Sequence, residues 1–399
     1  MPHEMKSPGT FMFTPISVRF GTKFKLINCF TNFNDFIMTT PAEEIIKIPR
    51  KKIKDISRDP EKTAKAINLL YVQDSQEGVK RIKKGGNFIY TLKDKKVTDS
   101  TTLQRIKNLV IPPAWENVWI CTSANGHLQA TGIDAKKRKQ YKYHPLWNTL
   151  RNHTKYYRLL EFARVLPAIR IQLEKDLSLE GLAAEKILAL IVSLIEKTNI
   201  RIGNNFYEKI YGSFGLTTLK NRHVEIKGNE LHFLFKGKKG IEHKITLKSK
   251  KLSALVKKCR DIPGKELFQY YDEAGLKKPI DSGMVNEYIK KISGGDYSAK
   301  DFRTWAGSLN AFIAFKELGI PETDAERKKN TLQVLNTVSK HLGNTPNVCK
   351  KYYIHPAILS VYENKFAKKY FDKKQNQKDN DKNNLNPEEA TMVKILEAI

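Results

Sequence analysis

The sequence predicts an α+β protein in which a small β-rich domain precedes a larger, mostly helical domain that contains a β-meander. Three observations support this class. Short apolar runs alternate with turn residues between positions 85 and 121, apolar residues recur at helical spacing after position 145, and strand-like runs interrupt the helical part near position 230. The 399 residues suffice for two domains of roughly 150 residues each, with further segments at the ends.

Residues 1–50 are predicted to form a variable or disordered extension, because Phe, Thr, Asn and Pro mix there without clear periodicity. Met38 could itself be a translation start. The segment lacks the charged region, apolar core and small-residue cleavage site of a secretory signal, so no such signal is expected.

The β-rich domain is predicted over residues 51–150. Its strands are expected at residues 88–92 and 118–121, because both runs contain mainly aromatic, β-branched and other apolar side chains. Two adjacent glycines at residues 85–86 mark a turn before the first run. The change to helical spacing then sets the domain boundary near residue 150.

The mostly helical domain is predicted over residues 151–371. Residues 182–197 are apolar on nearly every side, so they should form a helix buried in the core of this domain. Strand-like runs at residues 224–226, 231–235 and 243–247 are separated by glycine-containing turns. These three runs should pair as a β-meander inside the helical domain.

A polar, largely disordered tail is predicted over residues 372–399. Its first part, residues 372–386, consists almost entirely of Lys, Asn, Gln and Asp. Such a segment cannot bury enough apolar surface to offset the entropy lost on ordering. Residues 387–399 have the composition for a short terminal helix.

The charge balance points to a polyanionic partner. Lys and Arg number 71 against 42 Asp and Glu, which gives a net charge of +29 that is spread along the chain. Such a field attracts nucleic acid. A surface that only keeps the protein soluble, or one that binds a membrane, would also be basic. The longest apolar stretch, residues 187–195, is interrupted by Ser193 and is far shorter than the roughly 20 residues of a membrane-spanning helix.

No cofactor is predicted. The four cysteines are too few and too scattered for a disulfide framework or a zinc site, which indicates a reducing compartment. The sequence also contains no HExxH pair, no Walker phosphate loop and no GxGxxG fingerprint. We therefore expect no metal ion, ATP or dinucleotide.

Residues 132–144 form a basic cluster in which Tyr and Gln alternate with positive charges. Such side chains can pair with phosphates and offer planar groups to sugars and bases, although the alternative is a solvated loop. We predict that double-stranded DNA is the partner. The predicted DNA contacts are Tyr90, Lys136, Lys137, Arg138, Lys139, Gln140, Tyr141, His144 and Lys300.

Four dispersed residues acquire meaning from their order and context: Arg201, Lys238, Arg303 and Tyr353. With them, the sequence resembles the type IB DNA topoisomerases, in particular the compact poxvirus and bacterial branch. The resemblance covers roughly residues 77–370. The stretches that carry it are residues 111–115, 126–130, 138–141, 215–219, 302–307 and 342–346.

The resemblance implies that the β-rich domain binds DNA and that the helical domain is catalytic. It also implies that the two close as a C-shaped clamp around duplex DNA and that the protein works as a monomer, without a nucleotide cofactor or a membrane. The bacterial-like motifs indicate a cytoplasmic, nucleoid-associated protein, with a large virus as the alternative source.

The chemistry of such an enzyme suits these residue types. Reversible cleavage of a phosphodiester without metal or ATP needs a covalent intermediate, and Tyr353 can supply the attacking oxygen. Arg201 and Arg303 can hold the negative charge of a phosphorane-like transition state. Lys238, in a predicted turn, can protonate the leaving sugar oxygen. Asn344 lies nine residues before the tyrosine, where the poxvirus-like enzymes have His, and its amide can donate a hydrogen bond to a phosphoryl oxygen.

Neighbouring residues of the same type are the alternatives. Tyr352 is assigned to packing or to a DNA contact, because in the family the nucleophile directly precedes an aliphatic residue and His-Pro. Lys236 and Lys239 flank the preferred lysine and are expected to contact phosphates. His341 is expected to pack against its helix or to cap it.

The reaction that the resemblance implies is relaxation of positive and negative supercoils. One strand is nicked, held as a 3′-phosphotyrosyl link, allowed to swivel and resealed, without ATP or metal. Two other functions stay open. A tyrosine recombinase or integrase shares this fold, but its second arginine normally follows a His by three residues, where this chain has Lys300. A catalytically inactive architectural protein would explain the charge alone.

Overall fold

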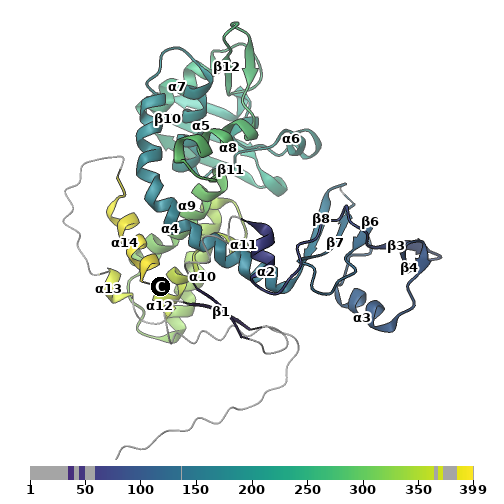
Figure 1. Ribbon diagram of the computed structural model, residues 1–399. Coiled ribbons are helices and arrows are strands. Elements are labelled where there is room, and N and C mark those ends of the chain that lie inside the picture. Colours follow the sequence, from purple (N-terminus) through teal and green to yellow (C-terminus); the bar gives the residue numbers. More distant parts are fainter. Residues whose placement is uncertain are drawn as a thin grey trace, which may run out of the picture. The chain divides into compact units, whose positions relative to one another are not determined.

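The structure is a computed structural model, and the chain divides into two units, Met1–Trp147 and Asn148–Ile399 (Figure 1). The residues that the structure describes are 35–39, 45–49, 59–135, 137–363, 367–371 and 384–398.

The predicted N-terminal extension contains regular structure. Strands β1 (Asp35–Thr39) and β2 (Ile45–Pro49) pair in antiparallel fashion, with Ile37 opposite Lys47. This differs from the prediction of a variable or disordered segment, because the isoleucines of β2 give the second strand a high β-propensity. The rest of residues 1–50 lies outside the described residues.

Unit 1 is built on a six-stranded antiparallel sheet with the strand order β5-β4-β3-β6-β7-β8, which confirms the predicted β-rich domain. The two-residue turn between β3 and β4 needs positive φ angles, and it uses Gly85 (φ +55°) and Gly86 (φ +84°). The elements of this unit are α2 (Pro60–Lys65), β3 (Val79–Lys84), β4 (Asn87–Leu92), β5 (Lys95–Lys96), α3 (Ser100–Asn108), β6 (Glu116–Ile120), β7 (Leu128–Ile133) and β8 (Lys139–Tyr143).

One face of this sheet packs on α3 and forms the small core of unit 1. Ile106 of α3 is buried together with Val79, Val118 and Ile120 of the strands. Helix α3 begins at this place because the Asp99 carboxylate accepts a hydrogen bond of 2.6 Å from the backbone N–H of its third residue.

Unit 2 is mostly helical and contains the predicted meander, a three-stranded antiparallel sheet with the order β11-β10-β9. The strands of this sheet are β9 (Val224–Lys227), β10 (Glu230–Lys236) and β11 (Glu242–Lys248), and a separate two-stranded sheet contains β12 (Gln269–Tyr271) and β13 (Lys277–Pro279). Its helices are α4 (Pro145–Asp176, which begins in unit 1), α5 (Ala184–Thr198), α6 (Asn205–Tyr211), α7 (Lys250–Arg260), α8 (Ser282–Ser293), α9 (Ala299–Leu318), α10 (Asp324–Leu342), α11 (Pro346–Tyr352), α12 (Pro356–Glu363), α13 (Lys368–Phe371) and α14 (Pro387–Glu397).

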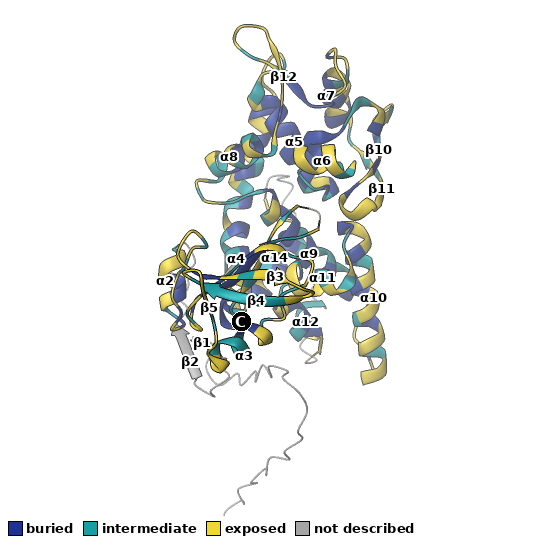
Figure 2. Ribbon diagram, turned by 90° about the vertical axis from the view of Figure 1, so that its right-hand side faces the viewer, coloured by how far each residue is buried: buried dark blue, intermediate teal, exposed yellow. Residues whose placement is uncertain are grey.

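Helix α5 is buried in the core of unit 2, as its apolar sequence predicts, and Figure 2 shows it largely in the buried colour. Every residue from Lys186 to Ile195 is buried, and the helix packs against α8 and α9. It ends at Asn199, which adopts a left-handed conformation with φ +57°. Among the described residues, no helix is both long enough and apolar enough to cross a membrane.

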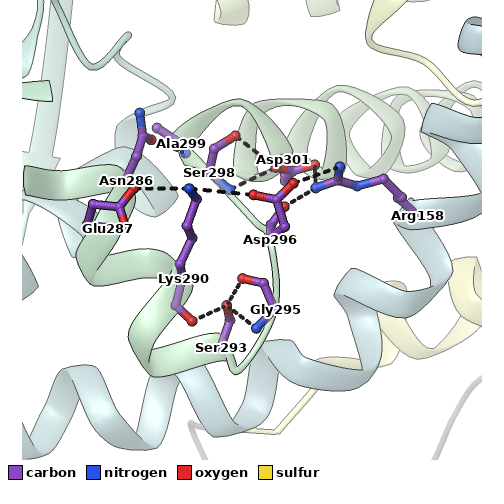
Figure 3. Close-up of polar contacts among 10 residues, drawn as sticks. All are labelled: Arg158, Asn286, Glu287, Lys290, Ser293, Gly295, Asp296, Ser298, Ala299 and Asp301. Carbon is purple, nitrogen blue, oxygen red and sulfur yellow. Dashed lines mark hydrogen bonds and ion pairs between the residues drawn. The ribbon is translucent and has the colours of Figure 1, made fainter. Parts of the chain in front are cut away.

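The start of α9 is fixed by a polar network that joins three helices (Figure 3). Asp301 accepts a hydrogen bond of 2.9 Å from the backbone of Ser298 and so closes a capping box. Asn286 of α8 accepts a bond of 3.1 Å from the first backbone N–H of α9. Arg158 of α4 donates to the carbonyl of Asp296, just before the helix. These contacts set the direction in which α9 presents its side chains.

Helix α14 forms where the sequence predicts a short terminal helix, but it belongs to the core of unit 2 and not to a largely disordered tail. Met392 and Ile395 are buried, and the carboxylate of Glu389 lies 2.8 Å from Arg170 of α4 and accepts a bond of 3.1 Å from the Trp305 indole of α9. The polar composition ends at Asn386, which caps the helix. Residues 372–383 lie outside the described residues.

Candidate active site

Two arginines from different elements are held by the same stretches of backbone. Arg303 lies on the buried side of α9 and donates to the carbonyls of Asn199 and Leu342, the latter at 2.7 Å. Arg201 follows the end of α5 and donates to the carbonyl of Gly343 at 2.9 Å. The end of α5 and the end of α10 therefore bring both guanidinium groups to one place.

The two guanidinium groups form a partly buried centre of positive charge. Burial lowers the pKa of Arg201 below its ordinary value. Burial, followed by the charge of Arg201, lowers the pKa of Arg303 to about 10. The Arg303 Nε is buried and has no hydrogen-bond partner among the described residues. Two charged forks that desolvation disfavours are well suited to bind an anion with several oxygens.

Asn344 joins this pair with its donor group free. Its Oδ1 accepts a hydrogen bond of 2.5 Å from Arg201 Nη2, which fixes the oxygen of the amide toward the guanidinium. The amide Nδ2 is consequently turned away, and it is buried without a partner among the described residues. A buried donor of this kind loses free energy unless an acceptor arrives, and a phosphoryl oxygen is such an acceptor.

The Tyr353 ring lies against this centre. Its centroid is 5.5 Å from the guanidinium carbon of Arg303. The backbone of Tyr353 is held by Ser308 of α9, whose hydroxyl donates to the tyrosine carbonyl at 3.2 Å. Gly307 allows this approach, since a β-carbon there would lie 2.7 Å from the same carbonyl oxygen. Helix α9 thus holds both Arg303 and the tyrosine.

Tyr352 lies in a different setting. Its side chain is 40% exposed, and the Lys351 ammonium lies 5.4 Å from its ring. The structure brings Tyr353, and not this neighbour, to the arginine of α9. The choice between the two tyrosines therefore has geometric support.

Lys238 lies in the exposed turn between β10 and β11, in the short helix η3 (Lys238–Gly240). Lys236 and Lys239 are exposed as well, and Lys239 has a positive φ of +64°. Within the described residues, Lys238 forms no hydrogen bond or ion pair with either arginine. The structure thus places this lysine on a projecting turn whose side chain is available to a ligand.

His243 of β11 was absent from the predicted site, although it lies beside it. Both arginine charges act on its ring, and a groove next to Asn344 is lined by His243 and His341. His341 is exposed in the last turn of α10. The alternation of β11 offers a signal for His243, because it occupies the inward phase shared with Ile245.

The basic cluster of unit 1 splits between the two sides of β8. Lys139, Tyr141 and Tyr143 share the more exposed side of the strand, and the two tyrosine rings stack at 5.9 Å. The Lys139 ammonium lies 2.6 Å from the Asp74 carboxylate and 5.7 Å from the Tyr141 ring. This side offers a cation and two aromatic rings together.

The other members of the cluster hold the turn between β7 and β8. Arg138 and Gln140 both donate to the carboxylate of Asp134, at 2.8 and 2.9 Å. Lys137 lies 2.7 Å from the carboxylate of Glu116. These side chains already have acceptors within the protein, so a DNA phosphate would have to compete for them. Lys136 lies outside the described residues.

Tyr90 and Tyr141 lie on opposite faces of the sheet. Tyr90 pairs with Arg81, which shares its face with Val79 and the small core. Tyr141 pairs through β7 and β6 with Lys80, on the other face. A DNA duplex that lies on one face of the sheet therefore cannot contact both tyrosines.

The last two DNA-contact candidates have different surroundings. His144 accepts a hydrogen bond of 3.2 Å from the backbone near the start of α4, and burial lowers its pKa. Lys300 is exposed in the first turn of α9. Within the described part of the chain, no three His, Cys, Asp or Glu side chains lie together as a metal site would require.

Comparisons with known proteins identify the family. The model of the eukaryotic DNA topoisomerase I catalytic core matches residues 136–380, and that of the bacterial DNA topoisomerase IB N-terminal domain matches residues 87–134. DNA topoisomerase 1B of Acanthamoeba polyphaga mimivirus is 30% identical over 296 residues, which are 72% of this chain and 88% of that protein. DNA topoisomerase 1B of Vaccinia virus (strain Copenhagen) is 25% identical over 288 residues, which are 70% of this chain and 86% of that protein.

A solved structure of the XerH site-specific recombinase, in a post-cleavage complex with its palindromic difH substrate, has a TM-score of 0.32 and 14% identity. It covers 52% of this chain and 50% of the recombinase chain. The resemblance seen in the sequence is thus confirmed by two family models that follow each other along both units and by viral relatives matched over most of their length: the chain belongs to the type IB DNA topoisomerase family, in its compact viral and bacterial-like form.

Proposed function

We propose that this chain is a DNA topoisomerase that relaxes positive and negative supercoils by cutting and rejoining one strand, with Tyr353 as the nucleophile. The observation that supports this most is the cluster in unit 2. There, the Tyr353 ring lies beside two guanidinium groups, next to an amide donor that has no partner in the described residues. Each group has a task in the transfer of a phosphoryl group.

The reaction begins with attack of the Tyr353 phenolic oxygen on the scissile phosphorus, and the phenolic proton passes to solvent water. The bond from phosphorus to the 5′ oxygen breaks, and its electron pair stays on that oxygen. Lys238 donates the proton that the leaving 5′ oxygen needs. The product is a 3′-phosphotyrosyl link and a free 5′-hydroxyl strand.

The charge that develops on the non-bridging oxygens is matched by Arg201, Arg303 and the Asn344 amide. These donors are already held by backbone carbonyls and by one another, so little reorganisation is needed when the phosphate arrives. Because the link conserves the energy of the phosphodiester, attack by the 5′ hydroxyl reverses the step. Torsional strain in the DNA drives the swivel between the two steps.

The same proposal extends to partners and conditions. Every catalytic group is a side chain of this protein, so the reaction needs no ATP and no metal ion. The exposed side of β8, with Lys139, Tyr141 and Tyr143, is the surface of unit 1 that we assign to DNA. We propose a monomer that acts on chromosomal DNA in the cytoplasm, in association with the nucleoid.

Plasmid relaxation tests this proposal. The full chain should relax both positively and negatively supercoiled plasmid in EDTA without nucleotide. Denaturation during the reaction should leave protein covalently attached to the 3′ side of a nick. A strict need for Mg²⁺ or ATP, or relaxation without any covalent adduct, would contradict the mechanism. A requirement for a specific partner site would favour the recombinase alternative.

A further inference from the structure

One histidine fills the space between the two segments that carry Lys238 and Asn344. His243 lies on β11 opposite Phe235 of β10, and the two rings stack at 5.0 Å with an angle of 14° between their planes. The stacking fixes the plane of the imidazole and directs its edge away from the phenyl ring. That edge meets two glycines.

The two glycines are the residues directly before the predicted catalytic side chains. A β-carbon on Gly237 would lie 2.6 Å from both Cδ2 and Nε2 of His243. A β-carbon on Gly343 would collide with Cε1 of the same ring and lie 2.9 Å from its Nε2. The imidazole is therefore packed against both backbones at once, which only glycine permits at these positions.

The turn that carries Lys238 has a fixed internal shape. Gly237 donates to the carbonyl of Ile241 at 2.8 Å, and Gly240 donates to the carbonyl of Gly237 at 3.0 Å. These bonds close the turn on itself and do not tie it to the end of α10. The His243 ring provides that second connection.

The ring also suits a site filled with positive charge. Burial, followed by the charges of Arg201 and Arg303, lowers the pKa of His243 to about 4. The ring is thus neutral at pH 7, so it adds packing without adding a third cation beside the arginines.

We infer that His243 is a positioning residue that holds the turn of Lys238 in register with the loop of Asn344. This inference rests on the proposed function, because it assigns the proton of the leaving oxygen to Lys238. It adds His243 to the side chains that cleavage needs, beyond the five predicted catalytic residues. Without the ring, the contact that joins the turn of Lys238 to the loop of Asn344 would be lost.

The test compares two leaving groups in single-turnover cleavage by the full chain. One DNA substrate carries the ordinary 5′ oxygen, and the other carries sulfur at that bridging position, whose thiolate leaves without a proton. His243→Ala should cleave the oxygen substrate about 10- to 100-fold more slowly, which is part of the roughly 10²- to 10⁴-fold that a general acid supplies. On the sulfur substrate, His243→Ala should cleave at nearly the rate of the unaltered chain.

Three variants calibrate the result. Lys238→Ala should show the same rescue by sulfur with a larger defect on oxygen. His341→Ala, which removes an exposed histidine from the same groove, should leave both rates unchanged. His243→Gln, whose planar amide fits between the glycines, should cleave the oxygen substrate faster than His243→Ala does. If His243→Ala unfolds, His243→Gln serves in its place, and its defect on the oxygen substrate should likewise be rescued by sulfur.

A double-mutant cycle tests the packing itself. Gly237→Ala should slow cleavage in the unaltered chain, because the new methyl group meets the ring. In the His243→Ala chain, where that space is empty, the same substitution should reduce the cleavage rate little further. Additive defects would refute the contact.

The two proposals fail in different ways. If sulfur rescues Lys238→Ala but not His243→Ala, the positioning role is wrong and the general acid stands. If sulfur rescues neither variant, the assignment of the proton to Lys238 is itself wrong. Full activity of His243→Ala on the oxygen substrate would also overturn the inference.

Discussion

Replacing Asn344 with alanine tests whether the buried amide acts on the phosphate. The side chain has two distinct ends, since Oδ1 accepts from Arg201 at 2.5 Å and Nδ2 is buried without a partner in the described residues. The change removes a desolvated donor next to the arginine pair. Loss of one donor to a developing oxyanion costs about 3 to 4 kcal/mol, so cleavage should slow by about 10²- to 10³-fold.

The assay is single-turnover cleavage of a suicide duplex, with duplex affinity measured separately. Affinity should change little, because most of the binding free energy comes from other phosphate contacts. Asn344→Asp is the matched variant. It keeps the size and the acceptor for Arg201 but replaces the donor with a negative charge, so it should cleave at least as slowly as Asn344→Ala. Asn344→His should retain substantial activity, because an imidazole N–H can donate from a similar position.

The control is His341→Ala, which should cleave at the rate of the unaltered chain. A large defect in that variant, with Asn344→Ala near the unaltered rate, would refute the reasoning. The pH profile gives a second check. An amide does not titrate, and the pKa of His243 is lowered to about 4, so cleavage should show no inflection near the roughly 6.5 of an ordinary histidine.

Four further outcomes are expected. Tyr353→Phe should abolish the covalent adduct on denaturing gels while duplex binding persists, and Tyr352→Phe should stay active; the reverse result would move the nucleophile by one residue. Duplex affinity should fall about 10³-fold between about 50 and 200 mM salt if about six phosphates are contacted, whereas a flat salt titration would argue against a phosphate-binding surface. Gly307→Ala should slow cleavage without weakening duplex binding, because its methyl group would displace the tyrosine carbonyl; an unaltered single-turnover rate would show that α9 tolerates the shift. Glu389→Gln should lower the free energy of unfolding at pH 7 by about 3 kcal/mol in urea titrations. Burial opposes ionisation of Glu389, but the hydrogen bonds and charge of Arg170 outweigh it and lower the pKa of the carboxyl group. The difference in the free energy of unfolding between the unaltered chain and Glu389→Gln should therefore have its full size above about pH 4.3, and it should disappear as the pH falls through the lowered pKa.

Much of the fold follows from local patterns. The runs of β4 and β10 and the apolar helix α5 are each marked by their own composition and by the turn residues around them, so the sequence predicts them without knowledge of distant contacts. Helix α14 shows where this fails. Its burial depends on Glu389 meeting Arg170, 219 positions earlier in the chain, and no local pattern records that a carboxylate has such a partner.

The candidate site divides in the same way. The arginines and the tyrosine were predicted from motifs that resemble a family, and the structure brings them together around Asn344. His243 was missed because a histidine in an alternating strand is ordinary, and its contact with Gly343 joins segments 100 positions apart. The split of the cluster at β8 was within reach of the sequence, since a period of two separates Gln140 from Tyr141.

The position of α14 in the chain has a consequence for the timing of activity during synthesis. Every predicted catalytic residue leaves the ribosome before Glu389 does, yet that carboxylate completes the partners of Arg170 and of the Trp305 indole on the helix of Arg303. A nascent chain, or one cut before Asn386, therefore contains every predicted catalytic residue, but Arg170 of α4 has lost one of its two carboxylate partners and the Trp305 indole of α9 has lost its acceptor. The ability to cleave DNA would thus appear only after almost all of this sequence has been translated, and cleavage by chains released before Asn386 would show that the order of synthesis gives no such protection.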